Sequence, residues 1–366
     1  MDRENGIPFE SIPLPAAEDY DKNRSRLIAY VDDVMTSRDD ILSLVGKNGI
    51  DMMKINHMNH AAFMTIIFLL NRFSLLEITL PWVYRAYHNH GFSYDYFPIE
   101  LNAWIDAVHG NLQPVNAEPV INVYRWIINR HEKNIETSLM WTYPVYRIDN
   151  GWIETYELFL GALIKSDTYK CSEIAFNSCK SETDIKAFYV NVAQPALYRI
   201  GDLWESGDVT VAMEHLATAI VSRTISQLSF LYKPVFNQGK RVMVLCISGE
   251  NHHLGALMVA NCFEMDDWNV NFIAESLPFS DTMQHLAAFK PHLLAISVTM
   301  PHNIFSMIEL IKKIKSGVYH DGMKILAGGQ AFKLFPDLPE ILGADAYAKD
   351  CYDAVITGRN LAGINL

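Results

Sequence analysis

The sequence is poor in cysteine, with only five among 366 residues, and the first of them is at position 171. No two cysteines have the Cys-x-x-Cys spacing of a zinc site or a redox motif. An odd number of widely spaced cysteines indicates reduced thiols, as in a cytoplasmic protein. Within the first 170 residues, the absence of cysteine also excludes a cofactor attached through a cysteine thioether.

Long hydrophobic runs and an excess of positive charge are also missing. The most lipophilic stretch, AAFMTIIFLL at 61–70, is too short to span a bilayer and predicts a buried helix. The net charge is −12 and no basic stripe is present, so we expect neither a membrane nor a nucleic acid as partner. The stretch at 1–15 has no apolar core behind a basic start, so we do not expect a signal peptide, and we predict a cytoplasmic location.

Three segments of the chain differ in hydrophobic periodicity. Residues 1–148 and 149–234 carry apolar residues at helical spacing. The second segment predicts a bundle of four helices, near 152–165, 168–179, 182–204 and 209–231. Asp208 is the expected N-cap of the last helix, and YKPVFNQGK at 232–240 predicts a linker. Residues 240–366 alternate short apolar runs with helical stretches, which predicts a five-stranded parallel sheet with helices on both faces.

Two adjacent histidines follow the first predicted strand, in GENHHLG at 249–255. A turn at the carboxyl end of a parallel strand lies where open α/β sheets bind ligands, and a neutral imidazole there can bind a metal. Taken alone, the stretch is equally typical of an exposed turn. The motif SVT at 297–299 follows the third predicted strand, and two glycines at 328–329 follow the fourth.

Together these elements resemble the cobalamin-binding domain of corrinoid proteins, which carries Asp-x-His-x-x-Gly, Ser-x-Leu or Ser-x-Thr, and Gly-Gly in this order. Glu250 stands in the place of the Asp, as it does in the B12-dependent photoreceptors. The resemblance implies a Rossmann-like, flavodoxin-like fold and a base-off, His-on cobalamin with His252 as the lower axial ligand of cobalt. Glu250 would accept the other imidazole N–H, whereas His253 is out of register.

The other motif residues would accommodate the displaced nucleotide tail of the cofactor. Gly255, Gly328 and Gly329 have no Cβ, so the backbone can approach the tail closely. Ser297 and Thr299 offer hydroxyl groups to it. The glycine pair is also compatible with a plain turn at the end of a strand.

The second segment resembles the helical cap of the adenosylcobalamin photoreceptors. Trp204 is followed after nine residues by Glu214 and His215, and the pattern Trp-x9-Glu-His marks this light-sensing branch. The resemblance implies that Trp204 covers the upper face of the cofactor and that the Glu-His pair meets the adenosyl group. Alternatively, Trp204 is an ordinary buried residue of the bundle, and Glu214 and His215 lie on the surface of a helix without a role in binding. In the light-sensing repressors, the residue after the Trp is a histidine that binds cobalt once light has expelled the adenosyl group. This chain has Glu205 at that position, so the resemblance does not identify the upper ligand after illumination.

The first segment, with WVYRAYHNH at 82–90, resembles the globin-like domain of the photocobilins, which hold biliverdin near the cobalamin. The expected biliverdin contacts are Tyr84, Arg85, His88, Tyr94, Trp104, Arg125 and His131. Arg85 and His88 are three residues apart on one helix, so they could meet one propionate. The alternatives are a scaffolding or oligomerisation domain and a haem globin with a histidine ligand. The segment has no helix-turn-helix pattern.

The sequence therefore predicts a three-part light sensor and not an enzyme. Light-driven cleavage of the cobalt–carbon bond of adenosylcobalamin would change conformation and self-association, and an unidentified downstream protein would receive the signal. A corrinoid methyl carrier of a methyltransferase system would share the second and third segments. A haem-globin sensor with a B12-like domain is the other alternative.

Overall fold

The computed structural model describes residues 11–46, 49–231, 239–274, 277–317, 322–333 and 335–363. The predicted linker YKPVFNQGK lies almost entirely outside these residues. The chain divides into two compact units. The first unit holds Met1–Tyr143 together with Glu205–Asp208, and the second holds Pro144–Trp204 and Val209–Leu366.

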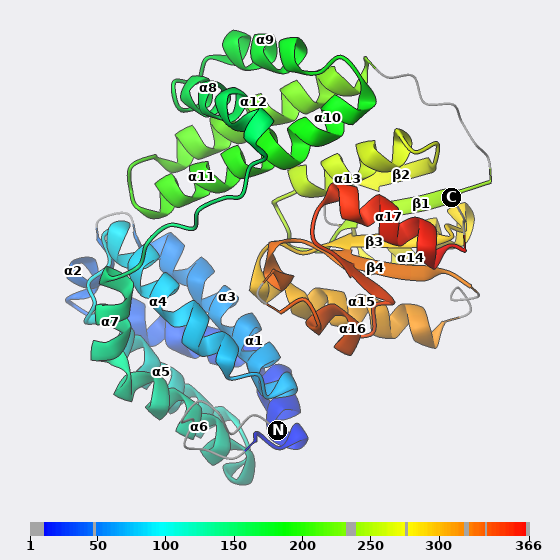
Figure 1. Cartoon of the computed structure of the whole chain (residues 1–366). Coiled ribbons are helices and arrows are strands. Elements are labelled where there is room, and N and C mark those ends of the chain that lie inside the picture. The colour runs from blue at the N-terminus through cyan, green and yellow to red at the C-terminus, as the bar shows by residue number, and fades with distance from the viewer. Residues whose placement is uncertain are drawn as a thin grey trace. The chain divides into compact units, whose positions relative to one another are not determined.

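The first unit is helical throughout its described residues, as predicted (Figure 1). Its helices are α1 (Leu14–Thr36), α2 (Ile41–Val45), α3 (Gly49–Leu70), α4 (Ser74–Asn89), α5 (Tyr96–Asn111), α6 (Pro114–Asn129) and α7 (His131–Leu139). Helix α1 packs along α3, α5 and α6, and α4 packs on α7. The lipophilic stretch is the end of α3, where Ile66, Ile67 and Phe68 are completely buried. This stretch is therefore part of the core, as its length indicates.

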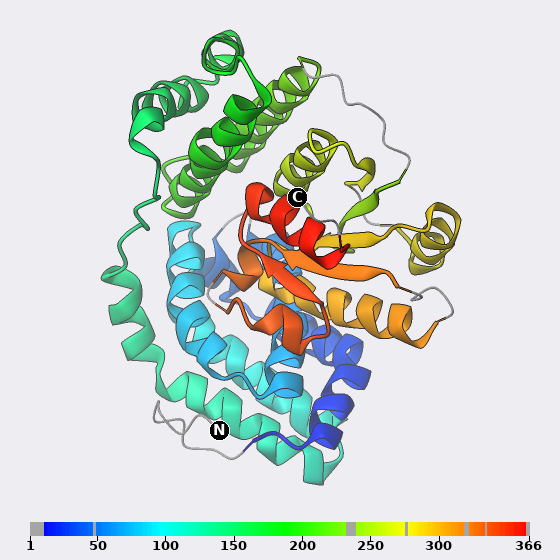
Figure 2. The same ribbon diagram turned by 45° about the vertical axis from the view of Figure 1, so that its right-hand side comes forward.

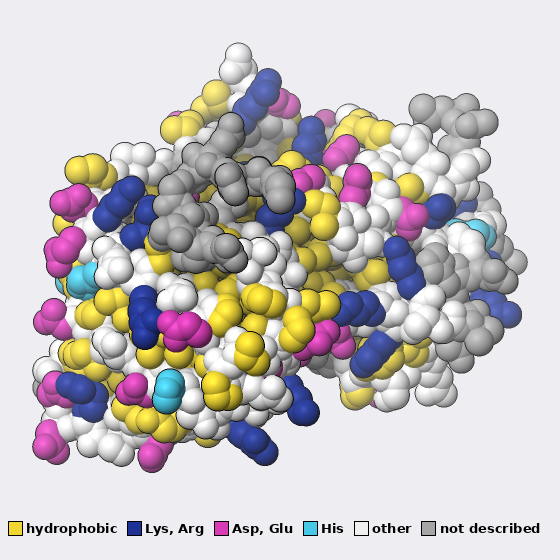
Figure 3. Space-filling model, turned by 90° about the horizontal axis from the view of Figure 1, so that it is seen from below, with side chains coloured by type: hydrophobic (Ala, Val, Ile, Leu, Met, Phe, Trp, Pro, Cys, Tyr) yellow, Lys and Arg dark blue, Asp and Glu magenta, His cyan; other side chains and the backbone are white. Residues whose placement is uncertain are grey.

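The charges and thiols of the described residues agree with the composition. No helix in these parts of the chain is both long and apolar enough to cross a membrane. On the face shown in Figure 3, Lys and Arg side chains are interspersed with acidic and hydrophobic ones. All five cysteines are buried and unpaired, which is consistent with reduced thiols.

The second unit begins with the predicted bundle. It contains α8 (Ile153–Ile164), α9 (Thr168–Ser178), α10 (Glu182–Phe188), α11 (Gln194–Glu205) and α12 (Val211–Ser229). The helix expected at 182–204 consists of α10 and α11, joined by a π-helical turn at Tyr189–Ala193. A π-turn inserts an extra residue and changes the phase of the helix that follows. At this turn Tyr189 is buried and its hydroxyl accepts a hydrogen bond from Asn261 Nδ2 at 3.0 Å.

The last bundle helix begins two residues later than predicted. Thr210 is the N-cap, because its hydroxyl accepts a hydrogen bond from the amide of Met213 at 3.3 Å. Asp208, the predicted N-cap, instead accepts a hydrogen bond from the Ser206 hydroxyl at 2.6 Å. The Asp208 prediction is wrong because two polar residues compete for this role and the turn before the helix decides between them.

The sheet of the second unit has five parallel strands, as predicted. They are β1 (Arg241–Cys246), β2 (Asn269–Ile273), β3 (Leu293–Ser297), β4 (Lys324–Gly328) and β5 (Ala346–Ala348), in the order β2-β1-β3-β4-β5. In this flavodoxin-like order the chain changes direction between β1 and β3, and ligands bind at the carboxyl ends of these strands. Cys246 at the end of β1 is level with Ser297 at the end of β3. The motif residues therefore follow the strands that flank the switch point.

Helices cover both faces of the sheet. Helices α13 (Leu254–Glu264) and α17 (Cys351–Leu361) pack together on one face, and α15 (Ile304–Ser316) lies on the other (Figures 1 and 2). The bundle and the sheet share one hydrophobic core, which includes Val221 of α12 and Phe263 of α13. The segments expected at 149–234 and 240–366 therefore pack against each other inside one compact unit.

Gly329 is the position at the sheet edge where a side chain has the least room. Its φ is +107°, and a Cβ there would lie 2.2 Å from the carbonyl oxygen of Val298. At Gly255, near the start of α13, a Cβ would meet no described atom within 4 Å.

We expect Gly329→Ala to lower the free energy of unfolding by about 1–3 kcal/mol from backbone strain alone, with the steric clash adding to it. Gly255→Ala should be neutral or stabilising by up to about 1 kcal/mol, because alanine favours the helix. Urea unfolding of the cofactor-free chain, followed by circular dichroism, measures both variants. Equal stability of the two variants would contradict the conclusion that a side chain is excluded at Gly329 and tolerated at Gly255.

Candidate functional site

Glu250 is the centre of the site at the carboxyl end of β1. The residue is only 3% exposed, and its Oε1 accepts two hydrogen bonds from His252. One comes from the backbone amide at 3.0 Å and the other from Nδ1 of the ring at 2.6 Å. An ionised carboxylate can only accept, so Nδ1 carries the proton. The imidazole is thereby held in one orientation and one tautomer.

The second carboxylate oxygen of Glu250 is bound by the loop that follows β3. Oε2 accepts hydrogen bonds from the amides of Thr299 and Met300, both at 2.9 Å, and from Asn303 Nδ2 at 3.1 Å. One carboxylate therefore joins the turns after β1 and β3. Asn303 was not identified as a site residue from the sequence. An amide side chain in the loop after the third strand could have indicated a hydrogen-bond donor to Glu250.

The hydrogen bonds decide the charge of Glu250. Burial alone would raise its pKa, but the hydrogen bonds from the His252 ring and from the amides of Met300 and His252 lower the pKa to about 2. The pKa of His252 is raised, chiefly by its hydrogen bond to Glu250, although burial acts in the opposite direction. An ionised carboxylate next to the ring increases the basicity of the imidazole.

The other ring nitrogen of His252 is available to a ligand. The side chain is 54% exposed, and Nε2 makes no hydrogen bond to any residue that the structure describes. In the neutral ring with its proton on Nδ1, Nε2 has the lone pair that can bind a metal. In the same parts of the chain, no three His, Cys, Asp or Glu side chains converge to hold a metal ion. A metal here would thus take His252 as a single protein ligand, with its remaining ligands supplied by a cofactor such as a corrin ring.

His253, the residue after His252, is placed differently. His253 is half-buried, and its Nδ1 lies 3.4 Å from the carbonyl of Asn251. It makes no contact with Glu250. The structure therefore places the carboxylate beside His252 alone, which is the register that the motif predicts.

The cap residues lie on α11 and α12. Trp204 is half-buried near the end of α11. In the first turns of α12, Glu214 accepts a hydrogen bond from the Thr218 hydroxyl at 3.0 Å and lies 2.7 Å from His215 Nδ1. The His215 side chain is 75% exposed. Glu214 also raises the pKa of His252, so its carboxylate lies close enough to act on this imidazole.

The predicted contacts to the nucleotide tail are of two kinds. Gly255 faces open space, which leaves room for a ligand. Gly328 and Gly329 are required by the sheet itself, since a Cβ at Gly328 would lie 2.9 Å from the carbonyl oxygen of Ala348. Ser297 and Thr299 lie in the loop at the end of β3, where Thr299 also holds Glu250 through its amide.

Four of the predicted biliverdin contacts form one cluster in the first unit. The Tyr84 hydroxyl lies 3.0 Å from His131 Nδ1. The Tyr94 ring stacks on His88 with centroids 4.1 Å apart, and it is also stacked with Tyr84 at 6.3 Å. Tyr84 in turn stacks on Phe97 at 3.7 Å. These residues provide flat aromatic walls and two imidazoles.

The other three predicted biliverdin contacts have partners outside these four residues. Arg85 forms an ion pair with Glu205. Trp104 is buried and stacked with Tyr124. Arg125 is exposed and paired with Glu118 at 2.7 Å.

A buried polar network in the first unit was missed in the sequence. His57 is completely buried between Asp32 and Tyr96, at 2.6 Å and 2.9 Å from its two ring nitrogens. His60 lies one turn later and contacts Tyr124, and burial lowers its pKa. Two histidines three residues apart on a strongly apolar helix could have predicted this network. Buried polar groups of this kind need partners from several helices.

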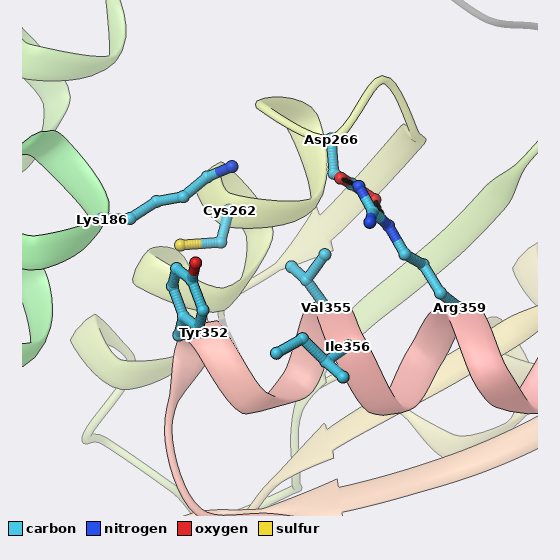
Figure 4. Close-up of a pocket in the computed structure, with 7 residues that line it drawn as sticks. All are labelled: Lys186, Cys262, Asp266, Tyr352, Val355, Ile356 and Arg359. Carbon is cyan, nitrogen blue, oxygen red and sulfur yellow. Dashed lines mark hydrogen bonds and ion pairs between the residues drawn. The ribbon is translucent and has the colours of Figure 1, made fainter. Parts of the chain in front are cut away.

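A small pocket in the second unit shares no residue with this site (Figure 4). Its volume is about 90 Å³, and it is lined by Lys186, Cys262, Asp266, Tyr352, Val355, Ile356 and Arg359. Ligand pockets usually have volumes of about 300–1,000 Å³. The pocket is therefore too small for a corrin ring, and Arg359 is already paired with Asp266 in it.

Two family models match parts of the second unit. Residues 240–356 match a family model described as "B12 binding domain", and residues 156–229 match a second model with the same description. The first match contains the Glu250–His252 pair, and the second contains Trp204 and the Glu-His pair. These matches support cobalamin binding by this part of the chain.

One curated protein is similar to part of this chain. The chain is 23% identical over 175 residues to the HTH-type transcriptional repressor CarH of Myxococcus xanthus, covering 48% of this chain and 57% of that protein. The chain thus spans little more than half of the length of this relative.

Two solved structures are similar to parts of this chain. The monomethylamine corrinoid protein of Methanosarcina barkeri is 14% identical with a TM-score of 0.50, and the match covers 57% of this chain and 99% of that chain. A cobalamin-binding protein of Desulfitobacterium hafniense DCB-2 is 17% identical with a TM-score of 0.32, covering 56% of this chain and 96% of that chain. The first of these supports the corrinoid-protein fold of the second unit.

The contacts of Asn303 predict a measurable contribution to stability. Asn303→Ala removes the hydrogen bond to Glu250 and the contact of Nδ2 with the Gly249 carbonyl at 3.3 Å. Hydrogen bonds to charged groups contribute about 1.5–3 kcal/mol, so we expect a loss of this size in the cofactor-free chain. Asn251→Ala, at an exposed position of the turn after β1, is the control and should change stability by less than about 0.5 kcal/mol. Chemical unfolding that does not distinguish the two variants would remove Asn303 from the site.

Proposed function

We propose that this chain is a light sensor that binds adenosylcobalamin in the base-off form, with His252 as the lower ligand of cobalt. One observation carries the proposal: a buried carboxylate with five hydrogen bonds holds the His252 ring and leaves Nε2 open. The B12-binding matches and the similarity to a transcriptional repressor support a regulatory role over an enzymatic one.

On the lower face, Glu250 sets the properties of the ligand. Its carboxylate keeps the proton on Nδ1 of His252, so that Nε2 is the nitrogen that faces the metal. The open space at Gly255 would admit the nucleotide tail, and the hydroxyls of Ser297 and Thr299 would be its polar partners. Gly328 and Gly329 would contribute indirectly, because they allow the close backbone packing that shapes the sheet edge beside the tail.

On the upper face, Trp204, Glu214 and His215 would form the adenosyl pocket. The bound cofactor would supply a light-sensitive cobalt–carbon bond. Val211 is 42% exposed on the same face of α12 as the Glu-His pair, which provides apolar surface for an adenosyl group. When this group leaves, Glu214 and His215 lose a partner and α12 changes its contacts. We infer a change in conformation and self-association, which a downstream protein reads, because a ligand shifts an equilibrium by its differential affinity for the two states.

In the first unit, a noncovalently bound biliverdin is the second part of the proposal. The aromatic cluster of Tyr84, His88, Tyr94 and His131 offers stacking surfaces and imidazoles for a linear tetrapyrrole. Because Arg85 is engaged by Glu205, a propionate would have to displace that carboxylate to reach Arg85. His88 is then the nearer candidate for a propionate contact.

Two other functions have a specific observation in their favour. The fold similarity to the monomethylamine corrinoid protein is also expected of a methyl-group carrier. Such a carrier needs His252 but has no use for Trp204 over the upper face. The buried His57 and the half-buried His60 of the first unit are what a haem-globin sensor would offer to iron.

Substitution of each histidine of the turn tests the lower ligand. We expect His252→Ala to weaken cobalamin binding or to shift the cobalt spectrum to that of a water-ligated form, because no other imidazole is held by Glu250. His253→Ala, the matched control, should leave affinity and spectrum unchanged. Absorption titration with adenosylcobalamin in the dark measures both, and similar behaviour of the two variants would show that the register is wrong.

One absorption experiment on the full chain tests the function. Protein supplied with adenosylcobalamin and biliverdin should absorb in the red, lose the red pigment on denaturation, and change its cobalamin bands after green light. The pigment is lost on denaturation because no cysteine is available for a thioether in the first unit.

The same spectra separate the alternatives. A Soret band in place of the red absorption would indicate haem. Cobalamin bands that do not respond to green light would favour the methyl carrier. Colourless protein after supply of biliverdin would leave a sensor that uses cobalamin alone.

A further inference from the structure

Arg85 and Glu205 form a buried ion pair inside the first unit. The two side chains are only 11% and 8% exposed, and Arg85 Nη2 donates to Glu205 Oε1. Asn89, one turn after Arg85 on α4, donates from Nδ2 to the backbone oxygen of Glu205 at 2.9 Å. Helix α4 therefore holds both the side chain and the backbone of Glu205 with residues of one face.

The guanidinium of Arg85 is fixed from a second direction. Its central carbon lies 4.8 Å from the centroid of the Trp141 ring and 5.3 Å from that of the Tyr143 ring, which are cation–π distances. Nε and Nη1 of Arg85 are buried and make no hydrogen bond within the described residues. Glu205 is thus the carboxylate that compensates this buried charge in the described part of the chain.

The ion pair acts on the residue before Glu205 in the chain. Trp204 and Glu205 are the last two residues of α11, and the division between the two compact units falls between them. Neighbouring side chains of one helix are about 100° apart around its axis, because one turn takes 3.6 residues. Fixing the Glu205 side chain therefore fixes the rotation of the last turn of α11 and the direction of the Trp204 ring.

A buried ion pair is well suited to such a role. Replacing both charges by apolar groups is often harmless, but removing one partner leaves an uncompensated buried charge. Rotation of the last turn of α11 would therefore separate Glu205 from Arg85 and leave the buried guanidinium without this carboxylate. The rings of Trp141 and Tyr143 lie at cation–π distance from the same guanidinium.

We propose that Arg85 is a positioning residue for Trp204: the contacts of α4 with Glu205 hold the tryptophan against the adenosyl group of the bound cofactor. This inference rests on the proposed function, in which Trp204 covers the upper face. It makes α4 of the first unit a determinant of which upper ligand the second unit accepts.

The test compares the affinities of the full chain for adenosylcobalamin and methylcobalamin in the dark, without biliverdin. Only the larger ligand reaches Trp204, so the ratio of the two affinities reports on the position of its ring. We expect Arg85→Gln and Glu205→Gln each to lower this ratio about five- to tenfold, within the usual range of coupling between sites. The affinity for methylcobalamin should change less than about twofold, which a general loss of structure would not allow.

Further variants make the test specific. The double variant Arg85→Gln/Glu205→Gln should resemble either single variant, because residues of one pair are not additive. Arg85→Lys keeps the charge and should restore most of the ratio. Arg38→Gln, in an exposed ion pair of the same unit with Asp40, is the control and should leave the ratio unchanged.

Two results would overturn the inference, and they are distinguishable. An unchanged ratio in Arg85→Gln and Glu205→Gln, with a reduced ratio in Trp204→Ala, would reject the role of Arg85 and leave the proposed function intact. An unchanged ratio in Trp204→Ala would reject the upper-face role of the tryptophan and the inference together. If Arg85→Gln does not fold, Glu205→Gln decides, because it removes the same ion pair.

Discussion

The buried carboxylate of Glu250 is the interaction on which the site depends. A charged group in the interior is unfavourable unless hydrogen bonds compensate for the lost water. Glu250 receives five of them, two from His252 and three from the loop that follows β3. The carboxylate is therefore stable as an anion only when the turns after β1 and β3 are both in place. The same carboxylate that joins the two turns also orients the His252 imidazole.

The second constraint is the shared core of the bundle and the sheet. Helix α12 packs on α13, and the π-turn between α10 and α11 is tied to α13 through Tyr189 and Asn261. Helix α12, which carries Glu214 and His215, is thus connected to α13, which begins two residues after His252. Because closely packed cores are bistable and not continuously deformable, a change at one face of a bound cofactor would be transmitted as a repacking of whole helices.

Local patterns in the sequence were sufficient for much of the fold. The strands of the sheet and the helices of the bundle were predicted, because each has its own hydrophobic period over its whole length. The ends and interruptions of helices were not predicted. Thr210 caps α12 where Asp208 was expected, and the π-turn at Tyr189–Ala193 interrupts a helix that looks continuous. Both depend on competition between nearby groups or on contacts with another helix, which no periodicity contains.

By itself the sequence determined the register of His252 behind Glu250, the spacing from Trp204 to Glu214 and His215, and the absence of a thioether attachment in the first 170 residues. Each is a matter of residue identity at a fixed short separation. Only the tertiary structure decided which groups compensate the buried charges. Asn303 is 53 residues from Glu250, and Glu205 is 120 residues from Arg85. A buried charge is stabilised by whichever donor or acceptor the fold places within hydrogen-bonding distance, and separation along the chain has no part in that choice.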